Sequence, residues 1–220
     1  MNWSEIFTLV STATWQTLIM VFFYTCFSVI LGLPLGILMC VTDSETGIMP
    51  KPLLNKVLNR IVDVLRSFPF LILMIVLFPL SRLIVRTSIG TVAAIVPLSI
   101  AAAPFVARII EAALKGIDPG VILAAKAMGS TNWQIIIKVM LPESLPALVD
   151  GITLTIINVI GYSAMAGTIG GGGLGDLANR YGYQRLRIDV LIVSVIVILI
   201  IVGIIQMTGS KISSSLMKKR

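Results

Sequence analysis

The chain has 220 residues, of which 57% are hydrophobic and 12% charged, and its mean hydropathy is +1.01. An ordinary soluble domain carries about twice that share of charge, so the composition excludes a soluble globule. The length of the chain therefore indicates how many membrane-spanning helices it can form, and not how many soluble domains. Because the chain has no histidine, a His-dependent metal site or proton relay is excluded. Cys26 and Cys40 lie in one apolar segment and indicate small core residues, with neither a disulfide framework nor a zinc site.

The N-terminal segment lacks the basic residues of a secretory signal, since the first Lys or Arg is Lys51. We therefore expect a retained first helix. Residues 1–12 carry Trp3, Ile6, Phe7 and Val10 on one side, which favours an external or interfacial segment. The net charge of +7 does not indicate nucleic acid, because the basic residues flank apolar segments and form no continuous basic face.

Five segments are apolar and close to the ~20 residues that cross a bilayer. We expect these spans at residues 15–41, 61–80, 87–107, 148–165 and 190–207. The predicted fold class is an all-α polytopic membrane protein with five transmembrane helices. Its organisation is the segment 1–12, a membrane domain at 13–207 and a basic tail at 208–220. No internal repeat is visible, and an odd number of spans argues against a duplicated fold.

The orientation follows from the basic residues in the loops, because cytoplasmic loops carry an excess of Lys and Arg. With five spans, one side collects twelve of the 17 basic residues: Lys51, Lys56, Arg60, Arg66, Arg108, Lys115, Lys126, Lys138, Lys211, Lys218, Lys219 and Arg220. The other side collects five: Arg82, Arg86, Arg180, Arg185 and Arg187. This predicts an external N-terminus, and a cytoplasmic C-terminus and loop at about 115–145.

That loop contains two short predicted helices hinged at Gly129. Asp118 can cap the first helix, with Pro119 in its first turn. Thr131 has the capping-box spacing for the second helix, and Pro142 is expected to end the run. The first helix is only ~15 Å long and cannot cross a bilayer. It either caps its own bundle, lies in the headgroups, or docks into a partner protein's groove.

The fourth span is the most polar one, with Thr153, Thr155, Asn158, Tyr162 and Ser163. Hydroxyls in membrane helices are commonly satisfied by their own backbone, but five polar groups also fit a polar path for a zwitterionic solute. Met165 either fills a gap or lines an apolar pocket. At the cytoplasmic end of the third span, Arg108 and Glu111 are three residues apart and are expected to pair on one helix face.

Residues 170–175 read GGGGLG but lack the Lys-Ser/Thr of a phosphate-binding loop, so this chain is not expected to hydrolyse ATP. The ten acidic residues lie in loops or near span ends, and no nucleophile with a base is indicated. The glycine run has two readings. It is a flexible external loop, or a close-packed re-entrant turn that serves as an external gate.

The cytoplasmic loop resembles the EAA loop of ABC-importer permeases. The resemblance is carried by Ala124-Ala125, then Gly129, Val139 and Leu141-Pro142, whereas Leu123 stands where the family has Glu. It implies a coupling helix that docks into the ATP-hydrolysing subunit. The residues it implies for docking are Ala124, Ala125, Met128, Gly129, Leu141 and Pro142. Substituting Gly129→Pro or Ala125→Glu is then expected to uncouple the subunits while the permease stays inserted.

Further segments resemble the permease family of the bacterial methionine ABC importers. These are residues 66–70 (RSFPF), 94–104, 161–165 (GYSAM) and 172–175 (GGLG). The resemblance implies a homodimer, two ATPase subunits with ATP and magnesium, an external substrate-binding protein and a bacterial cytoplasmic membrane. No cofactor is expected in this chain. We expect a substrate path at Asn158, Tyr162, Ser163 and Met165, and an external gate at Gly170, Gly171, Gly172, Gly173 and Gly175.

Other functions remain open at this point. The permease can serve another amino acid or small polar solute, and a homodimer path on the two-fold axis is a hypothesis from the thinness of five helices. An ATP-independent channel or secondary transporter is the alternative of a different class, but it usually carries intramembrane acids, which are not seen here. Vesicle uptake with and without ATP distinguishes these readings.

Overall fold

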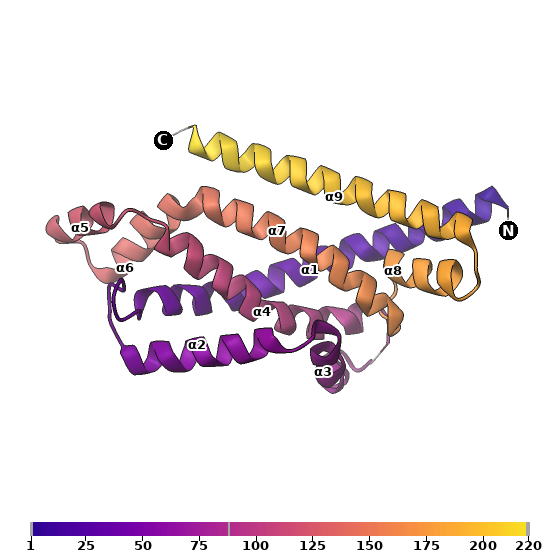
Figure 1. Cartoon of the computed structure of the whole chain (residues 1–220), viewed down its shortest axis with the longest axis horizontal. Helices are drawn as coiled ribbons and strands as arrows, with labels where there is room; N and C mark the ends of the chain where they lie inside the picture. The colour runs from indigo at the N-terminus through magenta and orange to yellow at the C-terminus, as the bar shows by residue number, and fades with distance from the viewer. Residues whose placement is uncertain (1, 88, 219–220) are drawn as a thin grey trace. The chain divides into compact units, whose positions relative to one another are not determined.

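The chain is predominantly helical in the part that the computed structural model describes, residues 2–87 and 89–218 (Figure 1). Met1, Ser88, Lys219 and Arg220 lie outside the described residues, so the last two residues of the predicted basic tail do as well. The helices are α1 (Trp3–Val41), α2 (Pro52–Ser67), α3 (Phe70–Val85), α4 (Thr91–Lys115), α5 (Pro119–Ala127), α6 (Asn132–Gln134), α7 (Leu141–Thr168), α8 (Gly173–Leu177) and α9 (Ile188–Met217). Two π-helices, η1 (Ile135–Met140) and η2 (Ala178–Tyr183), complete the order. The described residues contain no strand, which confirms the all-α prediction.

Within the described ranges, four helical runs are long and apolar enough to cross a membrane: α1, α4, the run Asn132–Thr168 and α9. Helices α2 and α3 together make a fifth if the pair is one broken span. Four of the five expected spans therefore fall on long apolar helices, and the one at 61–80 falls on the interrupted pair. Helices α4, α7 and α9 each end beyond the predicted end of the span.

The second span differs from the expectation of one continuous helix at 61–80. It breaks between α2 and α3, where Pro69 adopts φ −55° and ψ 126° directly before α3 begins. Proline lacks the N–H that the preceding turn needs, and it disfavours the helical conformation for the residue before it. The Phe68-Pro69 pair in the sequence was the signal for this break.

Helix α1 is continuous from Trp3 to Val41, so no break separates residues 1–12 from the following span. Trp3 and Phe7 are exposed, whereas Ile6 and Val10 are buried. The four positions share one side of the helix, as expected, and Ile6 and Val10 lie at its packed edge. Cys40 is buried as expected. Cys26 is exposed, and its assignment to the core is wrong.

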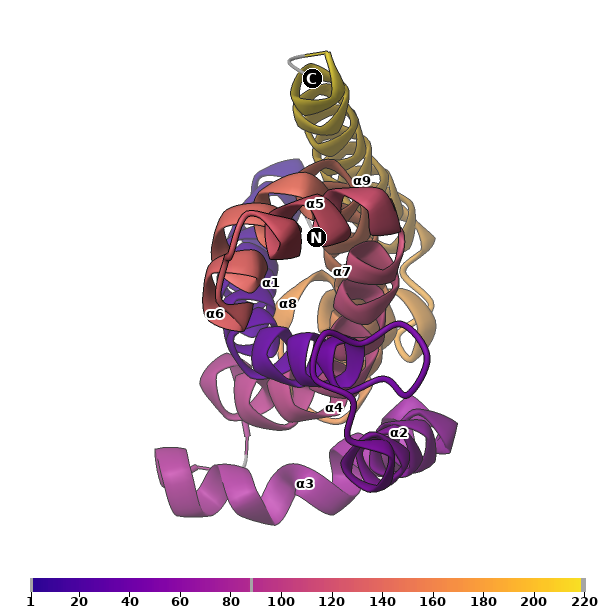
Figure 2. The same cartoon turned by 90° about the vertical axis from the view of Figure 1, so that its left-hand side faces the viewer.

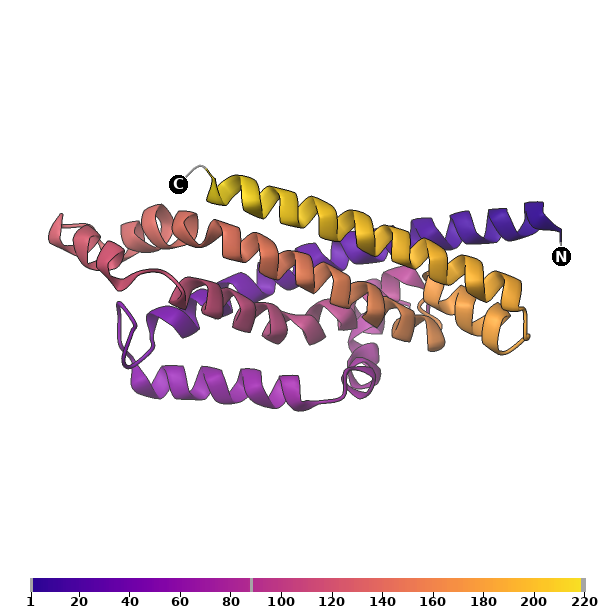
Figure 3. The same cartoon turned by 45° about the horizontal axis from the view of Figure 1, so that its top comes forward.

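The chain divides into two compact units, which are described separately. Unit 1 comprises Met1–Ser28, Phe68–Ala102 and Thr155–Met207. Its larger apolar cluster is built around Met20, Tyr24, Met74, Leu98 and Ile160. A second cluster joins Ile6, Val10, Leu174, Leu177 and Val190. Figure 3 shows α8 between the end of α7 and the start of α9, where this second cluster forms.

Unit 2 comprises Val29–Ser67, Ala103–Leu154 and Thr208–Arg220. Within it α1 and α4 approach closely, because a Cβ on Gly36 would lie 2.6 Å from the carbonyl oxygen of Ala107. Glycine at this position thus permits the helix contact. Figure 2 shows α5 and α6 of this unit toward the viewer, as two short helices joined by a tight turn.

Candidate functional site

The loop between α4 and α7 folds as its end signals predict. The Asp118 carboxylate accepts a hydrogen bond from the Gly120 N–H at 2.7 Å, and Pro119 occupies the first position of α5. Gly129 follows the helix with φ +79°, the left-handed conformation that glycine adopts without strain. Its N–H donates to the Lys126 carbonyl at 2.9 Å, which closes the end of α5.

The capping box at the start of α6 is also present. The Thr131 hydroxyl accepts from the Gln134 N–H at 3.3 Å, and the Gln134 side chain accepts from the Thr131 N–H at 2.9 Å. Two backbone donors at the helix start are therefore satisfied reciprocally.

Because of this box, we expect Thr131→Ala to weaken the start of α6 by about 1 kcal/mol. That corresponds to roughly fivefold faster hydrogen–deuterium exchange at the Gln134 amide if exchange proceeds by local opening. Ser130→Ala is the matched control, since its side chain is not part of the box. Equal exchange in Thr131→Ala and the unsubstituted chain would show that the cap does not hold this turn.

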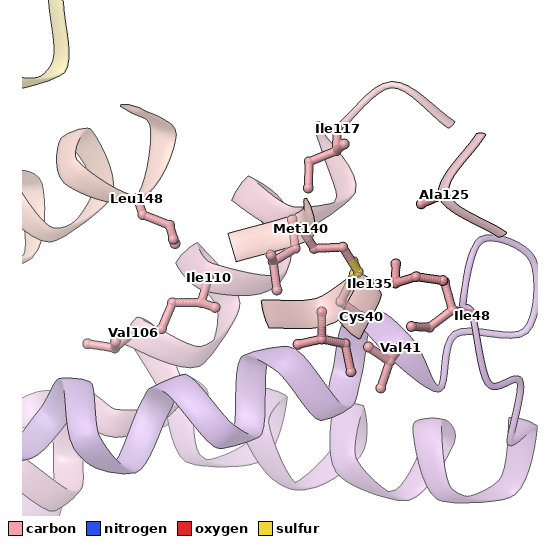
Figure 4. Packing of buried hydrophobic residues seen from close by; sticks show 12 residues of the cluster. Cys40, Val41, Ile48, Val106, Ile110, Ile117, Ala125, Ile135, Met140 and Leu148 are labelled. Carbon is pink, nitrogen blue, oxygen red and sulfur yellow. The ribbon is translucent and has the colours of Figure 1, made fainter. Parts of the chain in front are cut away.

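Helix α5 rests on an apolar cluster of unit 2. Ala125 is 3% exposed and packs with Ile48, Ile117, Ile135 and Met140. Figure 4 shows Ala125 on the side of α5 that faces Ile135 and Ile48. A charge at Ala125 would be buried in this core, so Ala125→Glu would damage the chain itself and does not test docking cleanly.

The opposite side of this loop is exposed. Met128 is 79% exposed, Leu123 is 63% exposed and Trp133 is 70% exposed. Ala124 and Gly129 are exposed as well. The structure thus brings the predicted Ala124, Met128 and Gly129 onto open surface, together with Leu123 and Trp133, which were not among the predicted docking residues. Large apolar side chains without cover are typical of a surface that contacts lipid or another protein.

The far end of the loop differs from the prediction that Pro142 stops the run. The helical run continues from Asn132 to Thr168, and the π-helix Ile135–Met140 precedes α7 directly. Pro142 is the second residue of α7, where the wider turn of the π-helix accommodates its ring. Leu141 is half-buried and packs against the apolar cluster that holds Ala125, whereas Pro142 is exposed.

The four predicted path residues separate into two pairs on α7. Asn158 and Met165 are exposed, at seven residues' spacing on one helix face. Tyr162 is half-buried and stacks on Phe70 with ring centroids 4.0 Å apart and planes at 14°. Ser163 is buried, and its hydroxyl donates to the Ile160 carbonyl at 2.8 Å. Asn158, Tyr162 and Met165 therefore share one face of α7, on which Phe70 partly covers Tyr162, and Ser163 is buried away from that face.

The glycine run forms a close-packed turn. Gly172 has φ +77° and stands at the start of α8, and the Gly173 N–H donates to the Gln16 side chain at 3.0 Å. A Cβ on Gly175 would lie 2.1 Å from the Cα of Ala164. Gly171 is buried and Gly170 is exposed at the edge of the turn. Of the two readings in the sequence, the close-packed turn matches this geometry and the flexible loop does not.

A charged network in unit 2 was only partly visible in the sequence. The expected Arg108–Glu111 pair is present at 2.7 Å. Arg108 also binds Asp63 at 2.5 Å, and Lys115 binds both Glu111 at 2.9 Å and Asp43 at 2.8 Å. These additional contacts join residues up to 72 positions apart, which no local spacing reveals.

The electrostatic consequence is clearest at Asp43, in the loop after α1. The hydrogen bond from Lys115 and those from the Thr46 and Glu45 N–H groups hold the pKa of the Asp43 carboxyl well below its usual range. Because folding lowers this pKa, the hydrogen bonds to the ionised Asp43 stabilise the folded chain above about pH 4. This stabilisation is lost as the pH falls below that value and the carboxylate is protonated. Asp43 and Lys115 therefore stay paired at neutral pH.

Among the described residues, no group of three or more His, Cys, Asp or Glu side chains is placed to hold a metal ion. The candidate residues lie in separate places: the loop with its open apolar face is in unit 2, and the α7 face and the packed glycine turn are in unit 1.

Comparison with known proteins decides the family. The profile described as "Binding-protein-dependent transport system inner membrane component" matches residues 32–210. The chain belongs to this permease family. The match covers the loop, the polar part of α7 and the glycine turn. It confirms the family resemblance that these motifs carry in the sequence.

Relatives within the family are named as methionine permeases. The chain is 49% identical over 201 residues to the "Probable D-methionine transport system permease protein MetI" of Vibrio cholerae, covering 91% of this chain and 89% of that one. It is 47% identical over 176 residues to the "Methionine import system permease protein MetP" of Bacillus subtilis, covering 80% and 79%. These relatives are transport permeases, which indicates a membrane subunit and not an enzyme.

A solved structure agrees over nearly the whole chain. The permease chain from inward-facing conformations of the MetNI methionine ABC transporter matches with a TM-score of 0.95 and 42% identity, covering 98% of this chain and 99% of that one. An amino acid ABC transporter crystallised with histidines matches with a TM-score of 0.73 and 21% identity. The second likeness supports the fold alone.

Proposed function

We propose that this chain is the membrane-spanning permease of an ATP-driven importer that carries methionine across the cytoplasmic membrane by alternating access. The observation that carries the proposal is the likeness to methionine permeases, at 49% identity over 91% of the chain, joined to a TM-score of 0.95 to the MetNI permease. The assignment of methionine as the substrate, in its D or L form, is based on the names of these relatives.

The proposed assembly has two copies of this chain, two cytoplasmic ATP-binding subunits and an external substrate-binding protein. ATP and magnesium belong to the ATP-binding subunits, and this chain holds no cofactor. The charge distribution supports an external N-terminal segment at 1–12, a permease domain at 13–207 and a cytoplasmic tail at 208–220. The membrane is then the bacterial inner membrane, with the loop at 115–145 inside the cell.

In this assembly α5 is the coupling helix. Its support is the exposed apolar face of Met128 and Leu123 with Ala124, on a helix whose other side is held by the buried Ala125. Beside it lies a hollow of about 350 Å³, lined by Leu123 and Lys126 of α5 and by Ile48 of the α1–α2 loop. An apolar helix face beside a partly polar hollow suits docking into another protein. Gly129, Leu141 and Pro142 set the position of the two loop helices.

ATP binding would close the ATP-binding subunits and move the docked loops with them. Only a difference in contact between the closed and open states can shift the permease from inward-open to outward-open.

Solute released outside would then pass the exposed face of α7. We assign Asn158 and Met165 as contact residues, with Tyr162 between them on the same face and the buried Ser163 behind it. The turn of Gly170, Gly171, Gly172, Gly173 and Gly175 is the proposed external gate.

The test is uptake into proteoliposomes that contain this chain with its ATP-binding subunit and its substrate-binding protein. We expect methionine uptake only when ATP is present on the side of the ATP-binding subunit. ATP-independent uptake by this chain alone would overturn the importer. Uptake of a different amino acid in competition with methionine would retain the importer and replace the cargo.

For the path, we expect Asn158→Leu to reduce uptake about tenfold, because a lost hydrogen bond to a polar solute is worth about 1–2 kcal/mol. Ser163→Ala is the matched control. Its hydroxyl already donates within its own helix, so we expect less than a twofold change. The measurement is the initial rate of uptake at equal amounts of inserted permease. An unchanged rate in Asn158→Leu would remove this residue from the path.

A further inference from the structure

A buried carboxylate lies at the centre of the charged network in unit 2. Glu111 is 3% exposed, and its two oxygens bind different cations. One oxygen binds the Arg108 guanidinium at 2.7 Å, and the other binds the Lys115 ammonium at 2.9 Å. The three residues follow the i, i+3, i+7 pattern of one face of α4. Glu111 thus links two cations that each reach a different neighbouring segment.

The first cation, Arg108, reaches α2. Its guanidinium binds the Asn59 side chain at 2.7 Å and the Asp63 carboxylate at 2.5 Å. These two residues are one turn apart on α2, so Arg108 holds the helix at two points. Asn59 in turn donates to the Asn55 carbonyl, and Asn55 donates to the Met39 carbonyl at 2.7 Å. A chain of hydrogen bonds therefore runs from α4 across α2 to the end of α1.

The second cation, Lys115, reaches the loop after α1. It binds the Asp43 carboxylate at 2.8 Å. The other oxygen of Asp43 accepts from the N–H groups of Glu45 and Thr46, each at 3.0 Å. Lys115 is also the last residue of α4, three residues before Asp118, the cap of α5. The cation that anchors the α1–α2 loop is therefore adjacent in sequence to the start of the proposed coupling helix.

A gain in folding free energy is a weak explanation for the presence of such a charged network. Burying a carboxylate with two cations costs desolvation free energy that their attraction often only offsets, and apolar replacements of whole buried pairs are commonly neutral or better. What the network does provide is fixed geometry: Arg108 and Lys115 each bind a carboxylate on another segment, and Glu111 holds both cations in place on α4. Loss of a single member would loosen the connection between segments more specifically than it would melt the bundle.

We propose that Glu111 is a positioning residue for transport, which makes α2 and the α1–α2 loop move with the start of α5. This inference rests on the proposed function, since it assigns how the docked loop is mechanically joined to the membrane helices. When the ATP-binding subunits move α5, its first turn displaces Lys115 at the end of α4. Glu111 keeps Lys115 and Arg108 in a fixed arrangement, so Arg108 moves as well. Arg108 then moves α2 through its contacts with Asn59 and Asp63.

The test measures the ratio of ATP hydrolysed to methionine transported, in the complete complex. We expect Glu111→Gln and Lys115→Met to assemble with the ATP-binding subunit and to retain ATP hydrolysis within about twofold. Uptake should fall at least fivefold, so that the ratio rises by a similar factor. Lys115→Arg keeps the charge and the reach, and its ratio should stay near that of the unsubstituted chain.

Lys56→Met is the matched control for charge removal. Lys56 is exposed on α2 and takes part in none of the ion pairs among the described residues. Its ratio should be unchanged. An unchanged ratio in both Glu111→Gln and Lys115→Met would overturn the inference while leaving the importer intact. If Glu111→Gln fails to insert, Lys115→Met decides alone. Failure of the proposed function is distinct, since the unsubstituted complex would then show no ATP-dependent uptake.

Discussion

Gly175→Ala is expected to prevent correct packing of the turn between α7 and α9. An added Cβ would lie 2.1 Å from the Cα of Ala164 and 2.7 Å from its carbonyl oxygen. Both are backbone atoms, so no side-chain rotation relieves the clash. Gly167 makes the reciprocal approach, with an added Cβ 2.2 Å from the Asp176 nitrogen. Overpacking of this kind costs typically 1–3 kcal/mol or more, and contact with backbone places this site at the upper end.

We expect the Gly175→Ala protein to show at least about a tenfold lower yield of folded permease in detergent, or a clearly lower midpoint of thermal unfolding. Gly203→Ala in α9 is the matched control, because an added Cβ there meets nothing within 4 Å. Alanine is also the better helix former by about 1 kcal/mol, so the control should be neutral or slightly more stable. Equal yields of the two variants would show that the turn is free to open, and would favour a flexible loop over a packed gate.

Local signals in the sequence determined much of the loop between α4 and α7. Asp118, Gly129 and the Thr131–Gln134 pair each act within four residues, and the structure has all three features as predicted. Such signals are readable because backbone N–H groups at a helix end need a partner nearby in the chain. The prediction failed at Pro142, where the π-helix before it altered the hydrogen-bond pattern that the proline rule assumes.

Non-local contacts could not be predicted in the same way. Arg108 was expected to pair with Glu111, three residues away, but nothing in the sequence relates it to Asn59 or Asp63 on another helix. The inward direction of Ala125 is a second case. An alanine beside another alanine carries no sign of which one faces the core, and only the packing against Ile135 decides it. The family motif located the loop but did not identify its open face.

The open face leads to the second large effect. We expect Met128→Glu to abolish stable binding of the ATP-binding subunit while the permease inserts normally. Met128 is 79% exposed in the chain, so a charge there costs little in the permease alone. In the docked state the same charge would lie in an apolar contact, and burying an unpaired carboxylate is strongly unfavourable. A loss of at least about 2 kcal/mol, or roughly 30-fold in affinity, is expected for a central apolar contact.

Leu123→Glu is the most informative control, because it adds the same charge to the same helix. The EAA loop that this segment resembles carries Glu at that position, so a groove that accepts the family's loop should accept it here. We expect Leu123→Glu to bind the ATP-binding subunit within about threefold of the unsubstituted chain, measured by co-purification and by titration in detergent. If Met128→Glu also binds normally, α5 does not dock through this face. If only Met128→Glu fails, the contact is apolar at the C-terminal end of α5 and tolerant of charge one turn earlier.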